Sequence, residues 1–167
     1  MFGAALAGLP LGAAAQSAIV SDLAPPELPA AEIRPAAAGS LTLAQIGSEN
    51  SADIAQSGPG HQLDIVQDGI GNRMVVQQAE SLNKVVGLQA GNLNQAFIEQ
   101  VGIENSVMLV QTGIGNVASA VQTGASNAAS IEQVGNLNSA DVQQRGVGLN
   151  AVVRQVGDGN LARVVQF

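Results

Sequence analysis

The chain has 167 residues and a net charge of −7; hydrophobic residues make up 46% of it, but aromatic residues only 2%. It has no Cys, which excludes disulfides, thiolate chemistry and most structural zinc sites. The six basic residues form no cluster interleaved with aromatic side chains, so we expect no nucleic-acid partner. A globular core of this size normally uses more large rings, so the composition favours a thin core of small aliphatic layers.

Residues 1–15 are apolar and small, and they end in Ala13-Ala14-Ala15. This pattern resembles the apolar region and the Ala-x-Ala cleavage site of a secretory signal peptide, although the positively charged leader is missing. We therefore interpret residues 1–15 as a signal peptide with a trimmed or misplaced start. The alternative is a plain apolar tail. A membrane-spanning helix is disfavoured, because the run is short and contains Pro10.

Residues 16–40 contain Pro25, Pro26, Pro29 and Pro35 among Ala, Glu and Asp. Proline has no backbone N–H to donate, so it is excluded from central strands. We predict that residues 16–40 form a disordered Pro/Ala-rich linker or targeting segment.

An eleven-residue unit then repeats without a slipped residue from Gln45 to Gln166. The glutamines that open the units are Gln45, Gln56, Gln67, Gln78, Gln89, Gln100, Gln111, Gln122, Gln133, Gln144, Gln155 and Gln166. The glycines two positions later are Gly47, Gly58, Gly69, Gly91, Gly102, Gly113, Gly124, Gly135, Gly146 and Gly157, with Glu80 as the exception. The asparagines five positions after each Gln are Asn50, Asn72, Asn83, Asn94, Asn105, Asn116, Asn127, Asn138 and Asn160, with His61 and Leu149 as the exceptions. A fixed short period describes a repeat architecture rather than a local element.

The spacing within the unit predicts a strand. Asn, a small apolar residue, an aliphatic residue and the next Gln stand at alternate positions, so in a strand all four face the same side. The Gly-containing segment between Gln and Asn supplies a turn, because glycine permits positive φ. A helix is excluded, because Gly and Asn recur inside every unit. We therefore predict an all-β fold over residues 41–167: a parallel β-solenoid of two stacked sheets with about six coils and twelve strands.

Inward-facing glutamines and asparagines are costly unless they are hydrogen-bonded. In this arrangement each amide lies above its equivalent one coil away and can donate to one neighbour while it accepts from the other. Such amide ladders stabilise cross-β structure, and they also fix the strand register. The glutamine and asparagine columns are thus predicted to be structural ladders, and the glycine column to form the turns.

Two units depart from the pattern. The unit from Gln56 has Pro59 in its turn and His61 in the asparagine column, and the unit from Gln78 has Glu80 for Gly and Gly87 in the apolar column. We hypothesise that these weaker coils are gatekeepers against premature aggregation. Replacing Glu80 with Gly and Gly87 with Ile is then expected to shorten the lag of fibre growth.

Catalysis finds little support in the residues. His61 has no positioned nucleophile or partner, so a ladder or turn role is favoured. Asp53, Asp64 and Asp141 stand at outward positions, where a solvated face is favoured over a paired-carboxylate site. Calcium-binding turns need an Asp-rich glycine pattern, of which only Asp158-Gly159 gives a trace. We expect no enzyme activity, cofactor or metal.

Two broad functions remain open: a self-assembling solenoid and a monomeric solenoid that binds another molecule. A solenoid that stays monomeric needs atypical capping repeats. The segment from Leu161 to Phe167 reads as a regular strand without a cap, and an open coil edge can template another chain. The pattern therefore favours assembly of the chain with itself.

The columns closely resemble the curlin repeats of bacterial curli, a secreted functional amyloid. The motif Gln-x-Gly-x-x-Asn-x-Ala-x-x-x-Gln is intact at Gln111–Gln122, Gln133–Gln144 and Gln155–Gln166, and similar units fill residues 39–167. The resemblance implies a subunit kept unfolded in the periplasm with a chaperone, passed through an outer-membrane secretion channel, and added to an extracellular fibre at the cell surface. Such a fibre serves adhesion and biofilm matrix. The family's subunits divide into a major fibre former and a minor nucleator, each a partner of the other, and the residues leave that choice open.

Overall fold

The computed structural model describes residues 18–22, 32–34 and 39–167. These residues form strands and turns, and none of the described segments is a helix long and apolar enough to cross a membrane. The strands are β1 (Ala18–Asp22), β2 (Glu32–Arg34), β3 (Ser40–Ser48), β4 (Ser51–Ser57), β5 (Gln62–Ile70), β6 (Arg73–Ser81), β7 (Lys84–Asn92), β8 (Gln95–Ile103), β9 (Ser106–Ile114), β10 (Val117–Ala125), β11 (Ala128–Val134), β12 (Ser139–Val147), β13 (Asn150–Val156) and β14 (Leu161–Gln166).

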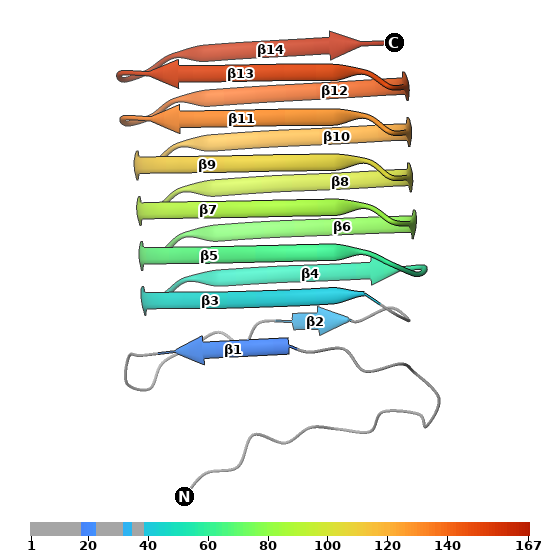
Figure 1. Ribbon diagram of the computed structural model, residues 1–167. Coiled ribbons are helices and arrows are strands. Elements are labelled where there is room, and N and C mark those ends of the chain that lie inside the picture. Colours follow the sequence, from blue (N-terminus) through green and yellow to red (C-terminus); the bar gives the residue numbers. More distant parts are fainter. Residues whose placement is uncertain (1–17, 23–31, 35–38) are drawn as a thin grey trace, which may run out of the picture.

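The strands alternate between two parallel sheets. The odd-numbered strands form one seven-stranded sheet and the even-numbered strands form the other, so each strand pairs with the strand two places away in the chain. The register shift is 22 residues throughout the repeat: Gln67 lies opposite Gln45 in β3 and opposite Gln89 in β7. Figure 1 shows the resulting stack of coils. The predicted two-sheet parallel β-solenoid is confirmed, with twelve of the strands, β3 to β14, in the repeat.

Two short segments of residues 16–40, Ala18–Asp22 and Glu32–Arg34, are strands in the structure. β1 pairs with β3 and β2 pairs with β4, both in parallel. The physical reason is that the free backbone edges of β3 and β4 accept an extended segment. The prolines do not obstruct this pairing, because Pro25, Pro26, Pro29 and Pro35 all lie outside the bounds of the two strands. The predicted signal peptide, residues 1–15, lies outside the described residues.

The core is a narrow band between the two sheets. Each repeat strand except β7 contributes two inward apolar side chains, in the small apolar and aliphatic columns; β7 contributes Val85 alone, because Gly87 stands in its aliphatic column. The buried apolar residues are Leu41, Leu43, Ala52, Ile54, Leu63, Ile65, Met74, Val76, Val85, Ala96, Ile98, Val107, Leu109, Ala118, Ala120, Ala129, Ile131, Ala140, Val142, Ala151 and Val153. Small side chains suffice because each coil only has to fill a layer about 4.8 Å thick.

The turns hold two residues at positive φ. The first is the column glycine; Gly69, for example, has a φ of +122°, and a Cβ there would collide with the carbonyl oxygen of Gly91 in the next coil. The second lies two positions later and is often not glycine, as at Leu82, Leu93 and Leu137, whose φ values are between +56° and +58°. Most strands run through the column glycine, so they reach nine residues rather than the roughly six expected for a strand.

Gly87 leaves no gap in the core. Met74, on the facing sheet, is fully buried and fills the space beside it: a Cβ on Gly87 would lie 2.7 Å from the Met74 sulfur. A residue with a Cβ at position 87 therefore requires the end of the Met74 side chain to move, and the shorter lag expected for Glu80→Gly with Gly87→Ile stays a prediction.

Candidate functional site

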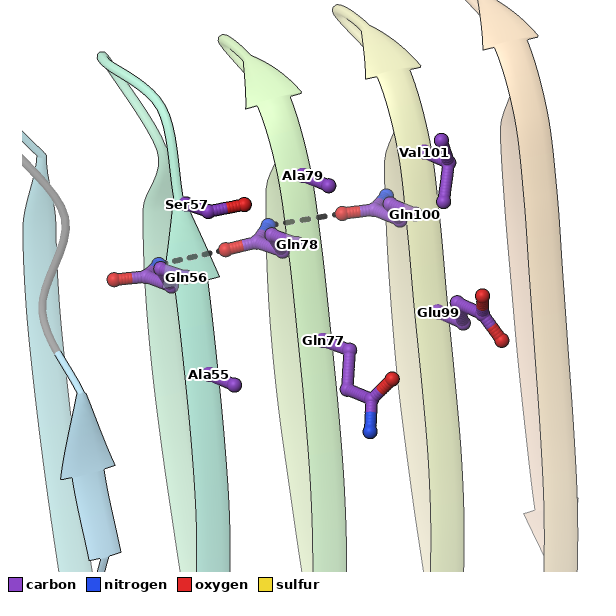
Figure 2. A pocket seen from close by; sticks show the side chains of 9 residues that line it. All are labelled: Ala55, Gln56, Ser57, Gln77, Gln78, Ala79, Glu99, Gln100 and Val101. Atoms are coloured by element: carbon purple, nitrogen blue, oxygen red, sulfur yellow. Dashed lines mark hydrogen bonds between the residues drawn. The ribbon is translucent and has the colours of Figure 1, made fainter.

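Two unbroken glutamine ladders run along the solenoid, one in each sheet. In every case Nε2 of one glutamine donates to Oε1 of the glutamine 22 residues later, with donor–acceptor distances from 2.6 to 2.9 Å. Figure 2 shows three consecutive rungs, Gln56, Gln78 and Gln100, joined in this way. The outer-face side chains Gln77 and Glu99 lie beside them in that view and take no part in the ladder.

The ladders have a fixed direction. The second N–H of most rungs donates to a backbone carbonyl of the facing sheet; Gln111, for example, donates to the Gln95 oxygen at 3.0 Å. Turning that amide over would place its oxygen against the carbonyl oxygen, which cannot donate. Every rung therefore donates toward the β14 end and accepts from the β3 end.

The rungs are fully buried in the middle of the stack. Gln67, Gln89, Gln100, Gln111 and Gln122 each have 0% exposure. Removing one rung leaves a buried donor and a buried acceptor unpaired, at roughly 1–3 kcal/mol each. The ladder accordingly penalises any coil that slips out of register.

The asparagine columns brace the turns, which is a richer role than the simple ladder expected from the sequence. Nδ2 of Asn94 donates to Ala90 O at 3.4 Å within its own turn and to Gly113 O at 3.0 Å in the next coil. Its backbone N donates to Oδ1 of Asn72 at 3.0 Å. The asparagine thus adds a side-chain donor to a carbonyl of its own turn and to one of the next coil, and five asparagine pairs also bond side chain to side chain.

His61 occupies an asparagine position but makes fewer of these bonds. Its Nε2 lies 2.9 Å from Ser57 O, which mimics the bond that asparagine makes within its turn. A carbonyl only accepts, so Nε2 carries the proton. Nδ1 is buried and is the one buried side-chain polar atom without a partner among the described residues. A ladder or turn residue, rather than a catalytic one, is what this environment supports.

The acidic residues singled out in the sequence lie apart from one another. Asp53 and Asp64 are exposed on the outer faces of different sheets. Asp141 is half-buried and pairs with Arg163 at 3.5 Å in the adjacent strand. The described residues contain no group of three His, Cys, Asp or Glu side chains placed to hold a metal ion. Surface hollows over the strands, such as the one in Figure 2, are shallow and open.

The first and last coils of the repeat, β3–β4 and β13–β14, present complementary polar groups. At the β14 end, Nε2 of Gln155 and of Gln166 donate to backbone carbonyls and have no further glutamine beyond them in the described sheets. At the β3 end, Oε1 of Gln45 and of Gln56 accept no bond from residues 39–167. One end therefore offers ladder donors and the other offers ladder acceptors.

The outer strand β14 also leaves its core side chains uncovered. Ala162, Val164 and Gln166 are half-buried, whereas Ala140 and Val142, in the same columns of β12, are 1% and 0% exposed. The outer-face residues Leu161 and Phe167 are both 82% exposed. This coil carries apolar surface of the kind that marks interaction sites.

Three features of the structure were not predicted from the sequence. The positive φ two positions after the column glycine is hidden by its mixed occupants, although the second glycine of several turns, such as Gly71 and Gly115, was a signal for it. The contact between Met74 and Gly87 was missed because the two residues lie in different sheets and in different columns of the repeat. The strands β1 and β2 carry no repeat motif.

One family of known proteins matches the chain. The sequence pattern described as "Curlin associated repeat" matches residues 40–69, 102–135 and 135–167, which is more than half of the chain. The stretch between the first two matches contains Glu80 and Gly87, yet it forms coils in the same register as the rest. No curated protein and no solved structure matches the chain at a significant level.

Proposed function

Because the chain belongs to the curlin repeat family, we propose that it is a structural subunit of a curli-like amyloid fibre, which grows by end-to-end addition of β-strands. Members of this family are extracellular fibre subunits, and both the family and the solenoid fold are structural rather than enzymatic.

The observation that carries the proposal is the complementarity of the two outermost coils. If the β13–β14 coil of one copy stacks on β3 and β4 of another in the same register, Gln155 lies opposite Gln45 and Gln166 lies opposite Gln56. The second N–H of each Nε2 then meets an Oε1 that accepts no bond from residues 39–167, and both ladders continue between chains. Head-to-tail contact of this kind does not close on itself, so it generates a filament.

Backbone and core support the same contact. The outer edges of β13 and β14 carry unpaired N–H and C=O groups that template a further parallel strand. The half-buried Val164 and Ala162 gain a covering layer from Leu41, Leu43, Ala52 and Ile54 of the second copy. In-register stacking of amides and small apolar residues is also what makes cross-β assemblies stable.

The remaining parts of the proposal come from the family. The chain would be exported to the periplasm, held unfolded there with a chaperone, passed through an outer-membrane secretion channel and folded at the cell surface. A second curlin subunit would be its partner, one of the two acting as nucleator. The fibre would serve adhesion and biofilm matrix.

The direct test is assembly from the unfolded state. The purified chain is dissolved in denaturant, diluted, and followed by dye binding, electron microscopy and fibre diffraction. We expect fibres with a reflection at about 4.7–4.8 Å. A folded monomer that persists in light scattering at high concentration would overturn the proposal and would favour the monomeric binding module instead.

A further inference from the structure

The strands β1 and β2 lie on the solenoid end at which a second copy would dock. Figure 1 shows both in blue, beneath β3 and β4, at the opposite end of the stack from β14. β1 pairs with Leu41–Gln45 of β3, and β2 pairs with Asp53–Ala55 of β4. They therefore use the same backbone edge that the ladder register assigns to the β13–β14 coil of another chain.

We propose that β1 and β2 form a displaceable cap, an autoinhibitory contact that must leave before the β3–β4 edge can receive a second copy. This inference rests on the proposed end-to-end assembly. The inward side chains of β3 support it: Leu41 and Leu43 are 3% and 1% exposed, although β3 is the first strand of the repeat. The corresponding residues of the outer strand β14 are half-buried.

The cap covers the edge incompletely. β1 pairs over five residues and β2 over three, whereas interior strands such as β7 and β9 pair over nine. At β4 the backbone edges of Ser51, Ala52, Gln56 and Ser57 stay outside the pairing. These positions give an incoming coil a place to begin pairing before β2 has left.

The cap also lacks the rungs of the ladder. Asp22 stands at the register position opposite Gln45, and β2 ends at Arg34, one residue before the position opposite Gln56. Neither position holds a glutamine, so the cap does not continue the column of rungs. The coil of a second copy brings Gln155 and Gln166 to these two positions. It therefore pairs with β3 and β4 more stably than β1 and β2 do, and it displaces them once it has begun to pair.

Because every junction in the fibre joins a β13–β14 coil to a β3–β4 edge, one cap leaves for each copy added. The cap therefore acts on elongation at either end of the fibre, and not only on nucleation. Because the pairing of one cap is lost at each junction, the cap slows addition and also lowers the net affinity of one copy for the next.

The test is seeded growth of full-length chains at a fixed mass of preformed wild-type fibres. The cap-breaking variant carries both Ile19→Pro and Val20→Pro, because adjacent strand residues direct their N–H groups to opposite edges, so one of the two removes a bond to β3. Its matched control carries Ala24→Pro and Ala30→Pro, outside both strands. The cap-strengthening variant is Asp22→Gln, which supplies a donor opposite Gln45.

We expect the elongation rate constant to rise about fivefold in the cap-breaking variant and to fall about fivefold in Asp22→Gln, the effect of one hydrogen bond on the cap. The control pair is expected to grow at the wild-type rate. Equal elongation rates in all four chains would overturn the cap while leaving the proposed function standing. Absence of fibres from the wild-type chain would instead defeat the proposed function itself.

Discussion

Met74 and Gly87 fit each other across the two sheets. Met74 has the longest side chain in the small apolar column, and Gly87 is the smallest residue in the aliphatic column. They belong to consecutive strands, β6 and β7, and the Met74 side chain fills the volume that an aliphatic residue occupies in the other units. The core of this coil keeps its volume although both columns depart from the pattern, and such volume-conserving exchanges are the ones that cores tolerate.

Filling Gly87 alone is therefore expected to destabilise the solenoid. Gly87→Ile places a branched side chain against the Met74 sulfur, and overpacking of this kind costs about 1–3 kcal/mol. The double variant Met74→Ala and Gly87→Ile restores the usual pair of residue sizes and recovers most of the loss. The measurement is the midpoint of guanidinium unfolding in dilute, non-aggregating solution; additive losses in the double variant would contradict the fit.

Glu80 stands where the other units have a turn glycine. Its φ is +78°, whereas the ten column glycines have φ values between +102° and +156°. Glu80→Gly removes a Cβ from a left-handed position and is expected to raise the free energy of unfolding by about 1 kcal/mol. Glu80→Ala keeps the Cβ and is the control, with no gain expected. If Ala stabilises as much as Gly, the effect belongs to the lost charge rather than to the backbone.

Replacing His61 with asparagine is expected to raise the stability of the solenoid. At the same column, Asn83 donates to Ala79 O and Gly102 O, and its Oδ1 accepts the backbone N of Asn105. The equivalent partners of residue 61 are Ser57 O, Glu80 O and Asn83 N, of which His61 engages only the first. His61→Asn adds two hydrogen bonds and is expected to stabilise by about 1–2 kcal/mol. Thermal and guanidinium unfolding measure this.

His61→Ala provides the opposite control. It removes the bond to Ser57 and leaves that carbonyl without a side-chain donor, so it is expected to destabilise by about 1 kcal/mol. A rise in stability in both variants would mean that relief of the buried, unpartnered Nδ1 outweighs the turn bonds.

The repeat made most of this fold predictable from the residues. A period of eleven with alternating columns determines the strand faces, the 22-residue register and the glutamine rungs, because Gln45 to Gln166 all obey one spacing. The repeat pattern shows only the features that all units have in common. The turn-bracing bonds of Asn94 were not predicted, because they depend on where the carbonyls of the next turn lie in space.

Features that occur in one unit only could not be predicted, because the repeat columns show shared features alone. Met74 and Gly87 read as two separate irregularities until the sheets are stacked. β1 has a mixed composition, and its strand exists through the edge of β3 rather than through its own propensity. Leu93 at a φ of +57° contradicts local preference and is held there by the strands on either side.

A central rung of the ladder is expected to matter far more than an amide on the outer face. Gln111 accepts from Gln89 at 2.8 Å and donates to Gln133 at 2.9 Å. Gln111→Met keeps the shape but leaves both neighbours unpaired, which is expected to cost about 2–5 kcal/mol. Gln77→Met, on the exposed outer face, is the control and is expected to change stability by less than about 0.5 kcal/mol. Similar losses in the two variants would mean that the rungs add no more than ordinary surface amides.

The rung at the β3 end separates the stability of one copy from that of the fibre. Within one copy Gln45 makes a single rung bond, to Gln67 at 2.7 Å, but in an end-to-end fibre it also accepts from Gln155 of the neighbouring copy. Gln45→Met is therefore expected to destabilise the isolated chain less than Gln111→Met does, yet to raise the concentration of soluble protein in equilibrium with fibres about tenfold. Sedimentation of mature fibres, followed by quantification of the supernatant, measures that concentration. If it stays at the wild-type value, the copies do not join through continuous ladders, and contact between the outer sheet faces becomes the better account of the fibre.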